Sequence, residues 1–314
     1  MVELKYLIRR LVQILLHSNL SLIVFIARIF RCLIPLRINF LRNYYDNFYE
    51  NYDATINIRE ISPRAMVAVD VGSRGGEHYL MSQYGNFFKN ILVEPEQDEA
   101  DWLKRQGNFV IDKAISDSLA KKTLYLTRDL AGSSLFEPDE KAFLLYNPSS
   151  DYFHDHFTVD KTISVDCTTL ENALGDLNID YIDFLKIDTQ GAEANVIFGL
   201  GSYRPLGIYT EVQFIPLYKG ITNGTELVSY LYDLGYVCIH QTSSMNGSIM
   251  MVEADCLFVP NHLSGAGKKI IKDREKEYSS IMLMFGQIRI LKIVSEQLNF
   301  SNNYLIQKIR DPFV

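Results

Sequence analysis

With 314 residues, of which 47% are hydrophobic, the chain is long enough to bury one large core and to carry appendages. Its formal net charge of -7 argues against a general nucleic-acid-binding protein. The cysteines lie far apart, with no C-x-x-C pair and no Cys/His cluster at zinc spacing, at Cys32, Cys167, Cys238 and Cys256. We therefore expect reduced thiols, a cytoplasmic location and no metal site.

Residues 1–42 have the opposite charge balance, because basic side chains are interleaved with apolar ones and Glu3 is the acid among them. The apolar run Leu22–Ala27 is much shorter than the ~20 residues that a membrane-spanning helix needs. Amphipathic helices in this segment predict either peripheral contact with an anionic membrane or packing on the catalytic domain or on a second subunit, as in a homodimer. Periodicity alone does not separate these alternatives.

The apolar run Val67–Val71 predicts a buried strand that carries Asp70 near its end. Gly72, Gly75 and Gly76 then allow a sharp turn and close approach of the backbone to a ligand before a helix that begins near Glu77. Such a turn at the end of a strand is typical of a nucleotide site.

A second short strand, Ile91–Val93, ends in Glu94 and Pro95. An acid at this point of an α/β unit is placed to accept hydrogen bonds from ribose hydroxyls. Strands and helices then alternate along the chain, which predicts a mainly parallel sheet. The polar segment 128–160 interrupts this alternation between two extra strands and is a candidate for acceptor recognition, since such sites usually lie on loops.

The glycine spacing argues against a dinucleotide. Asp70, Gly72 and Gly76 give D-x-G-x-x-x-G instead of G-x-G-x-x-G, and the chain has no phosphate loop of the Walker type. Acids accumulate around the predicted pocket, at Asp70, Glu94, Asp112, Asp188 and Glu193. These acids would repel a phosphate group but suit S-adenosyl-L-methionine, which carries a sulfonium and an ammonium group. A nucleotide-sugar or dinucleotide enzyme is thereby disfavoured.

A third motif is the strand that delivers Asp188 and turns through Gly191 into a helix, within Asp-Tyr-Ile-Asp-Phe-Leu-Lys-Ile-Asp-Thr-Gln-Gly-Ala-Glu at 180–193. Together with the first two motifs and the stretch Thr210–Tyr218, it strongly resembles the FkbM family of S-adenosylmethionine-dependent methyltransferases over roughly residues 60–260. The run Leu185–Glu193 is the most specific part of the resemblance. The family more often has a small or amide residue where this chain has Arg74.

The resemblance implies a class I methyltransferase fold, which is α/β and Rossmann-like, with a mainly parallel sheet and a C-terminal antiparallel hairpin. We expect a basic amphipathic helical extension at 1–58, the methyltransferase domain at 59–262 and a C-terminal helical extension at 263–314, where apolar residues recur with a helical period. The implied activity is transfer of a methyl group to an oxygen, typically a hydroxyl of a sugar, glycan or natural product.

The candidate site residues follow from the motifs and the resemblance. For cofactor binding they are Asp70, Gly72, Ser73, Arg74, Gly76, Glu94, Asp112, Ala114 and Asp188. For removal of the hydroxyl proton they are Asp188 first, then His156 and Glu211. For substrate binding they are Ser133, Ser134 and Gln190.

Alternatives remain open at several of these positions. Asp188 would also suit a structural role as the cap of the helix that begins near Gly191, and Asp70 would also suit a role in accepting backbone amides of its own loop. Ser133 and Ser134 fit a solvated turn as well as a substrate contact. For the whole chain, the alternative function is a non-catalytic scaffold that keeps the methyltransferase fold and binds a membrane or partner through its N-terminus.

Overall fold

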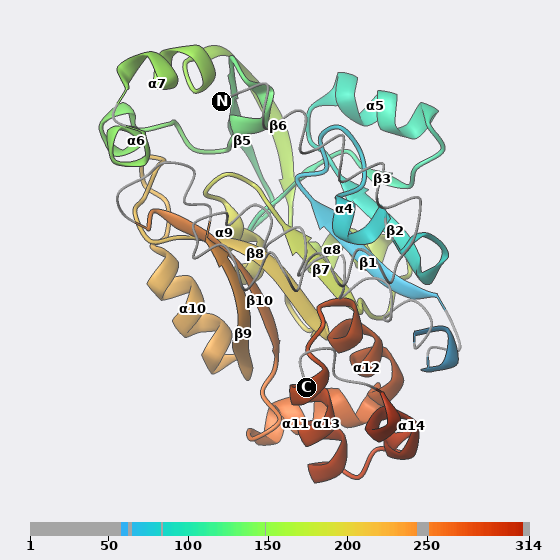
Figure 1. Ribbon diagram of the computed structural model, residues 1–314. Coiled ribbons are helices and arrows are strands. Elements are labelled where there is room, and N and C mark those ends of the chain that lie inside the picture. Colours follow the sequence, from blue (N-terminus) through green and yellow to red (C-terminus); the bar gives the residue numbers. More distant parts are fainter. Residues whose placement is uncertain (1–57, 62–64, 83, 148, 244–250, 310–314) are drawn as a thin grey trace, which may run out of the picture. The chain divides into compact units, whose positions relative to one another are not determined.

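The computed structural model describes residues 58–61, 65–82, 84–147, 149–243 and 251–309. Within them the main sheet has seven strands in the order β3-β2-β1-β7-β8-β10-β9 (Figure 1). The strands are β1 (Met66–Val71), β2 (Phe88–Val93), β3 (Val110–Ile111), β7 (Phe184–Ile187), β8 (Gly207–Gln213), β9 (Tyr236–Ser243) and β10 (Glu253–Pro260). Strands β3, β2, β1, β7 and β8 pair in parallel, whereas β10 is antiparallel to both β8 and β9. This confirms the expected class I methyltransferase sheet with its C-terminal hairpin.

Helices cover both faces of this sheet, which explains why strands such as β1 are apolar on both sides. One face packs through Val69, Leu185 and Ile208 against three helices. These helices are α8 (Leu170–Asp176), α9 (Glu193–Phe198) and α10 (Gly224–Asp233). The short helix α4 (Tyr79–Ser82) follows β1, and α5 (Gln97–Arg105) connects β2 to β3.

The opposite face, with Phe184 and Leu257, packs against the C-terminal helices. These are α11 (Gly265–Asp273), α12 (Glu275–Met284), α13 (Ile288–Gln297) and α14 (Asn303–Lys308) (Figure 1). The expected C-terminal helices are thus present. Their side chains Ile281 and Leu291 are fully buried in the hydrophobic core on this face of the sheet. The N-terminal extension predicted at 1–58 lies outside the described residues except for Ile58, which is fully buried in this same core.

A smaller sheet carries the polar segment of the sequence. It consists of β4 (Ala114–Ile115), β6 (Val159–Thr168) and β5 (Ala120–Thr127) in that order. Residues 128–158 between β5 and β6 contain the helices α6 (Glu140–Tyr146) and α7 (Ser150–His156), which lie beside these strands (Figure 1). Phe143 and Phe153 of the two helices pack on Leu217 and Tyr218, which follow β8. The segment is therefore anchored to the main sheet rather than solvated throughout.

Candidate functional site

The first motifs meet where β1 and β2 end side by side. The backbone amides of Gly72 and Ser73 donate to the carbonyl of Val93 at 3.1 and 3.2 Å, and the Ser73 hydroxyl donates to the same carbonyl at 3.1 Å. The glycine turn therefore crosses the end of β2 immediately before Glu94. The hydrogen bonds of Ser73 give this buried side chain a role in fixing the turn.

Glu94 is almost completely buried, with 4% of its surface exposed. Its Oε1 accepts a hydrogen bond from the backbone N–H of Glu96 at 2.9 Å. Burial raises the pKa of Glu94, while this hydrogen bond and the guanidinium of Arg74 lower it. Arg74 Nη2 lies 3.6 Å from Glu94 Oε1 and 3.7 Å from Glu96 Oε2, and its Nη1 lies 3.8 Å from Glu99. Arg74 therefore points into this group of acids.

Two glycines of the turn have open space around them. Gly75 and Gly76 have φ values of +81° and +113°, and a side chain built on either would meet no atom within 4 Å. A backbone that approaches closely and a buried carboxyl that accepts hydrogen bonds suit the ribose hydroxyls of S-adenosylmethionine. The residues present thus fit this cofactor.

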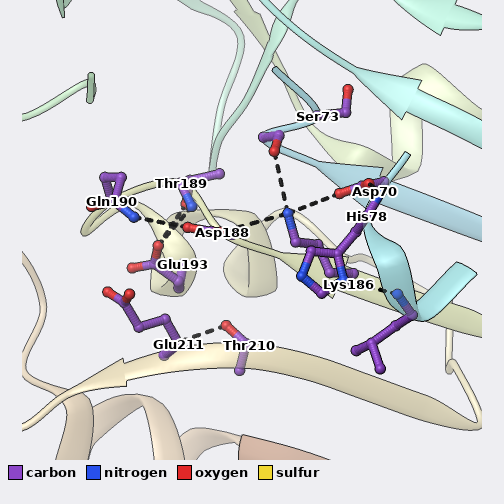
Figure 2. A network of polar contacts seen from close by, with 12 residues as sticks. Asp70, Ser73, His78, Lys186, Asp188, Thr189, Gln190, Glu193, Thr210 and Glu211 are labelled. Carbon is purple, nitrogen blue, oxygen red and sulfur yellow. Dashed lines mark hydrogen bonds and ion pairs between the residues drawn. The ribbon is translucent and has the colours of Figure 1, made fainter. Parts of the chain in front are cut away.

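Lys186 connects the motif of β1 with that of β7 (Figure 2). Its Nζ lies 3.0 Å from Asp70 Oδ1, 3.2 Å from the carbonyl oxygen of Gly72 and 3.7 Å from Asp188 Oδ2. Asp70 also accepts the backbone N–H of His78 at 3.0 Å, as the structural alternative for Asp70 predicts. Burial raises the pKa of Asp70 while Lys186 lowers it. Lys186 is not among the residues predicted from the sequence, although a lysine in the apolar run Phe184–Ile187 is a visible signal.

Asp188 follows β7, and its backbone N–H donates to the carbonyl of Val71 at 3.0 Å. Its Oδ1 accepts a hydrogen bond from Gln190 Nε2 at 2.8 Å, and 43% of the side chain is exposed. The backbone amides of Thr189 and Gly191 donate instead to the buried carboxylate of Glu193, at 2.9 Å from Oε1 and Oε2 respectively. Glu193 therefore organises this turn, and the side chain of Asp188 remains accessible (Figure 2).

Two further acids of the site lie on neighbouring strands of the main sheet. Glu211 of β8 pairs directly with Asp255 of β10, so that their side chains lie on the same face. Burial raises the pKa of both groups, and neighbouring carboxylates raise it further: for Asp255 the value rises to about 6, and for Glu211 it lies well above the ordinary range. Glu211 Oε1 also accepts from Gln213 Nε2 at 2.7 Å. Asp255 escaped the sequence analysis, although it interrupts an apolar strand.

His78 is a second residue that sequence reasoning missed. Its ring lies 4.4 Å from that of Tyr79 and 6.1 Å from that of Tyr209, centroid to centroid. Burial and the charge of Lys186 lower the pKa of His78 to about 4, so this imidazole is neutral at pH 7. Nothing in the local sequence distinguishes it, because only the fold brings Lys186 to it.

The remaining cofactor candidates follow β3. The backbone N–H of Glu94 donates to the carbonyl of Ile111 at 3.1 Å, which places Asp112 near the same edge of the sheet. The Asp112 carboxylate accepts from Lys104 Nζ at 2.7 Å, and this hydrogen bond lowers its pKa. Ala114 is buried in β4, where it pairs with Cys167.

The two serines expected to bind substrate make hydrogen bonds within their own turn. Ser133 Oγ accepts the backbone N–H of Thr127 at 3.2 Å. Ser134 Oγ accepts that of Phe136 at 3.0 Å and is 2% exposed. Both serines thus stabilise a turn, but the turn is not solvated as the alternative predicts, because Ser134 is buried.

His156 ends α7, where its Nδ1 lies 3.5 Å from Asp129 Oδ2 and its ring lies against Tyr152. The polar neighbour that the structure gives this candidate base is thus Asp129 rather than Asp188. Among the described residues, no group of three or more His, Cys, Asp and Glu side chains is placed to hold a metal ion. The helices in the described part of the chain are all too short or too polar to span a membrane.

Comparisons with known proteins agree with the motifs. The family model described as the methyltransferase FkbM domain matches residues 70–238, which is more than half of the chain. No curated protein matches. Among solved structures, the chain is similar to the 1,6-didemethyltoxoflavin-N1-methyltransferase of Burkholderia thailandensis with bound 1,6-didemethyltoxoflavin and S-adenosylhomocysteine, at 11% identity and a TM-score of 0.30, over 71% of this chain and 86% of that one. On the family match, the chain belongs to the FkbM methyltransferase family and is an S-adenosyl-L-methionine-dependent methyltransferase.

Proposed function

We propose that the protein transfers a methyl group from S-adenosylmethionine to a hydroxyl of a neutral sugar or glycan, with Asp188 as the group that accepts the hydroxyl proton. The observation that carries this proposal is the accessible carboxylate of Asp188 at the end of β7. Strands β2, β1 and β7 are adjacent, so Asp188 lies about 10 Å across the sheet from Glu94. That spacing leaves room for a cofactor between the two acids.

The cofactor, when bound, supplies a methyl group that is strongly electrophilic because it is attached to a positively charged sulfonium. The chain must then bind, orient and exclude water, and such positioning contributes up to ~7 to 11 kcal/mol in favourable cases. Glu94 would hold the ribose hydroxyls of the cofactor, and the turn at 72–76 would contact it through its backbone. A hydroxyl acceptor also needs a base because its proton is weakly acidic, and a positioned carboxylate accelerates such a step by ~100- to 10,000-fold.

The charges around Asp188 support a neutral acceptor. Lys186, the buried cation of this network, is paired with Asp70 at 3.0 Å and does not offer its charge to a phosphate or carboxylate of the acceptor. Glu211 and Asp255 lie on the same face and accept or donate hydrogen bonds according to their protonation. Carboxyl groups of this kind suit the hydroxyls of a sugar, and those that are ionised repel an anionic acceptor.

The test is a labelling screen with S-adenosylmethionine that carries a trideuteromethyl group. Neutral methyl glycosides and the matching uronic acids are incubated with wild type and with Asp188→Asn, and products are detected by mass. We expect labelled neutral sugars with wild type, little labelling of the uronic acids, and loss of at least about 100-fold in rate for Asp188→Asn. Labelling of the uronic acids in preference to the neutral sugars, or full activity of the variant, would overturn the proposal.

A further inference from the structure

The side-chain amide of Gln190 uses both of its ends. Its Nε2 donates to Asp188 Oδ1 at 2.8 Å, and its Oε1 accepts from the hydroxyl of Tyr218 at 3.0 Å. The backbone at Gln190 has φ +57°, in the left-handed region that a glutamine rarely adopts. A residue held in such a conformation with both amide ends engaged has little freedom left to contact a substrate.

Tyr218 is itself fixed in place, with 1% of its surface exposed. Its ring meets that of Phe143 edge to face at 5.8 Å. It also lies so close to Gly191 that a side chain on that glycine would reach Tyr218 Cδ2 at 3.2 Å. The hydroxyl lies 3.0 Å from both Gln190 Oε1 and the carbonyl oxygen of Gly132. Tyr218 thus links the turn after β7 to the segment between β5 and β6.

The Gln190 amide turns its donor end to Asp188, because a carboxylate only accepts hydrogen bonds, and the Tyr218 hydroxyl holds the other end of the amide. A glutamine amide has a donor end and an acceptor end of almost the same shape, so its orientation depends on its partners. With the amide in this orientation, the single proton of the Tyr218 hydroxyl is shared between Gln190 Oε1 and the Gly132 carbonyl oxygen, each 3.0 Å away. A donor at Oε1 keeps the Nε2 end toward Asp188. Asp188 Oδ1 is then occupied, while Oδ2 faces Lys186 at 3.7 Å and the accessible side of the carboxylate.

We propose that Tyr218 and Gln190 are positioning residues for Asp188, and that the hydroxyl of Tyr218 makes the orientation of the Asp188 carboxylate depend on the segment at 128–158. The inference rests on the proposed function, because it assumes that Asp188 faces the transferred methyl. It gives Gln190 a role other than the substrate contact expected from its sequence position.

The backbone at Gly132, where Tyr218 contacts the segment at 128–158, is tightly packed. A side chain on Gly132 would lie 2.7 Å from the ring of Phe157, so the backbone is wedged between that ring and the hydroxyl of Tyr218. A shift of the segment when an acceptor binds therefore moves the Gly132 carbonyl and redistributes the shared proton of Tyr218 toward or away from Gln190.

The test uses two cofactor analogues and needs no acceptor. Sinefungin carries a protonated amine where S-adenosylmethionine carries its methyl-bearing sulfonium, whereas S-adenosylhomocysteine carries neither charge. Calorimetry on the full chain gives the ratio of the two affinities. This ratio therefore measures how strongly a carboxylate at the methyl position interacts with the charged amine. A correctly oriented Asp188 favours sinefungin, and Asp188→Asn is expected to lower the preference for sinefungin by about tenfold or more.

Tyr218→Phe keeps the ring and removes only the hydroxyl, and Gln190→Met keeps the length of the side chain and removes both amide ends. We expect each to lower the preference for sinefungin by about three- to tenfold while the affinity for S-adenosylhomocysteine stays within about twofold of wild type. In the Asp188→Asn background, Tyr218→Phe should change nothing further, because the group that it positions is gone. Tyr203→Phe is the matched control, since its hydroxyl donates to the Ile179 carbonyl, outside this network.

The outcomes separate the two proposals. If Asp188→Asn leaves the ratio unchanged, Asp188 does not face the methyl position, and the proposed function fails together with the positioning role. If Asp188→Asn lowers the ratio but Tyr218→Phe and Gln190→Met do not, only the positioning role is overturned. It is also overturned if these two variants weaken both analogues equally, because that result indicates a general structural effect.

Discussion

The backbone carbonyl of Asp188 occupies the place where a side chain on Gly72 would begin: a Cβ built on Gly72 would lie 1.9 Å from this oxygen. Gly72 also has φ +84°, which disfavours any other residue. The glycine turn after β1 and the acidic turn after β7 are thus packed backbone to backbone. This contact sets the separation between the cofactor turn and Asp188.

Two glycines of the same turn give a matched pair of variants. Gly72→Ala introduces both the unfavourable φ and the clash with the Asp188 carbonyl, and we expect it to lower the free energy of unfolding by about 3 kcal/mol or more. Gly75→Ala has a similar φ of +81° but open space around the new methyl, and it should cost only about 1 kcal/mol. Denaturant unfolding measures both. Equal losses would show that the contact between the two turns is not rigid.

His78 makes stability depend on pH. Its pKa is lowered from an ordinary value near 6.5 to about 4, chiefly by burial, so between these values the unfolded chain binds a proton that the folded chain does not. This stability is fully present above pH 6.5 and is lost as the pH falls toward 4. We expect His78→Gln to reduce the fall in unfolding free energy between pH 6.5 and pH 4. At pH 8 the histidine is neutral in the folded and in the unfolded chain, so a difference in stability there measures only the change in packing. An identical pH profile in the variant would contradict the prediction.

Asp255 has the opposite dependence. Burial, and next the charge of Asp188, raise its pKa from 3.8 to about 6, so the folded chain holds a proton that the unfolded chain releases. The associated stability is present below pH 3.8 and is lost as the pH rises through 6. Asp255→Asn cannot ionise and should therefore be more stable than wild type by about 1 kcal/mol at pH 8, but not at pH 4. Thermal unfolding at the two pH values tests this.

Asp166→Asn is the control for this prediction, because its carboxylate is 61% exposed and pairs with Lys121 on the surface. We expect it to change stability by less than about 0.5 kcal/mol at either pH. A gain for Asp166→Asn as large as that for Asp255→Asn would attribute the effect to net charge rather than to burial.

The sequence predicts the scaffold well because its signals are local. Runs such as Val67–Val71 are long enough to define buried strands, and glycines mark the turns. The alternative role of Asp70, which accepts a backbone amide of its own loop, could also be predicted from the sequence. The role of Glu193 could not, because the sequence points to Asp188 as the cap of this turn. The domain boundaries, the membrane contact of residues 1–42 and the homodimer stay predictions.

The contacts inside the site escape sequence reasoning because they join residues that are far apart in the chain. Lys186 meets Gly72 across 114 positions, and Tyr218 meets Gly132 across 86. The pKa of His78 depends on Lys186, which only the pairing of β1 with β7 brings near. The hydrogen bond of Tyr218 likewise depends on how residues 128–158 fold onto the main sheet.

We propose that S-adenosylmethionine binds at the carboxyl edge of β1, β2 and β7, with its ribose on Glu94. The most direct measurement is calorimetric titration of S-adenosylhomocysteine and, in parallel, NAD into wild type and Glu94→Gln, with Asp101→Asn of α5 as the exposed control. We expect micromolar binding of S-adenosylhomocysteine that weakens about 10- to 100-fold in Glu94→Gln and is unchanged in Asp101→Asn, with no binding of NAD. Binding of NAD without S-adenosylhomocysteine, or unchanged affinity in Glu94→Gln, would contradict it.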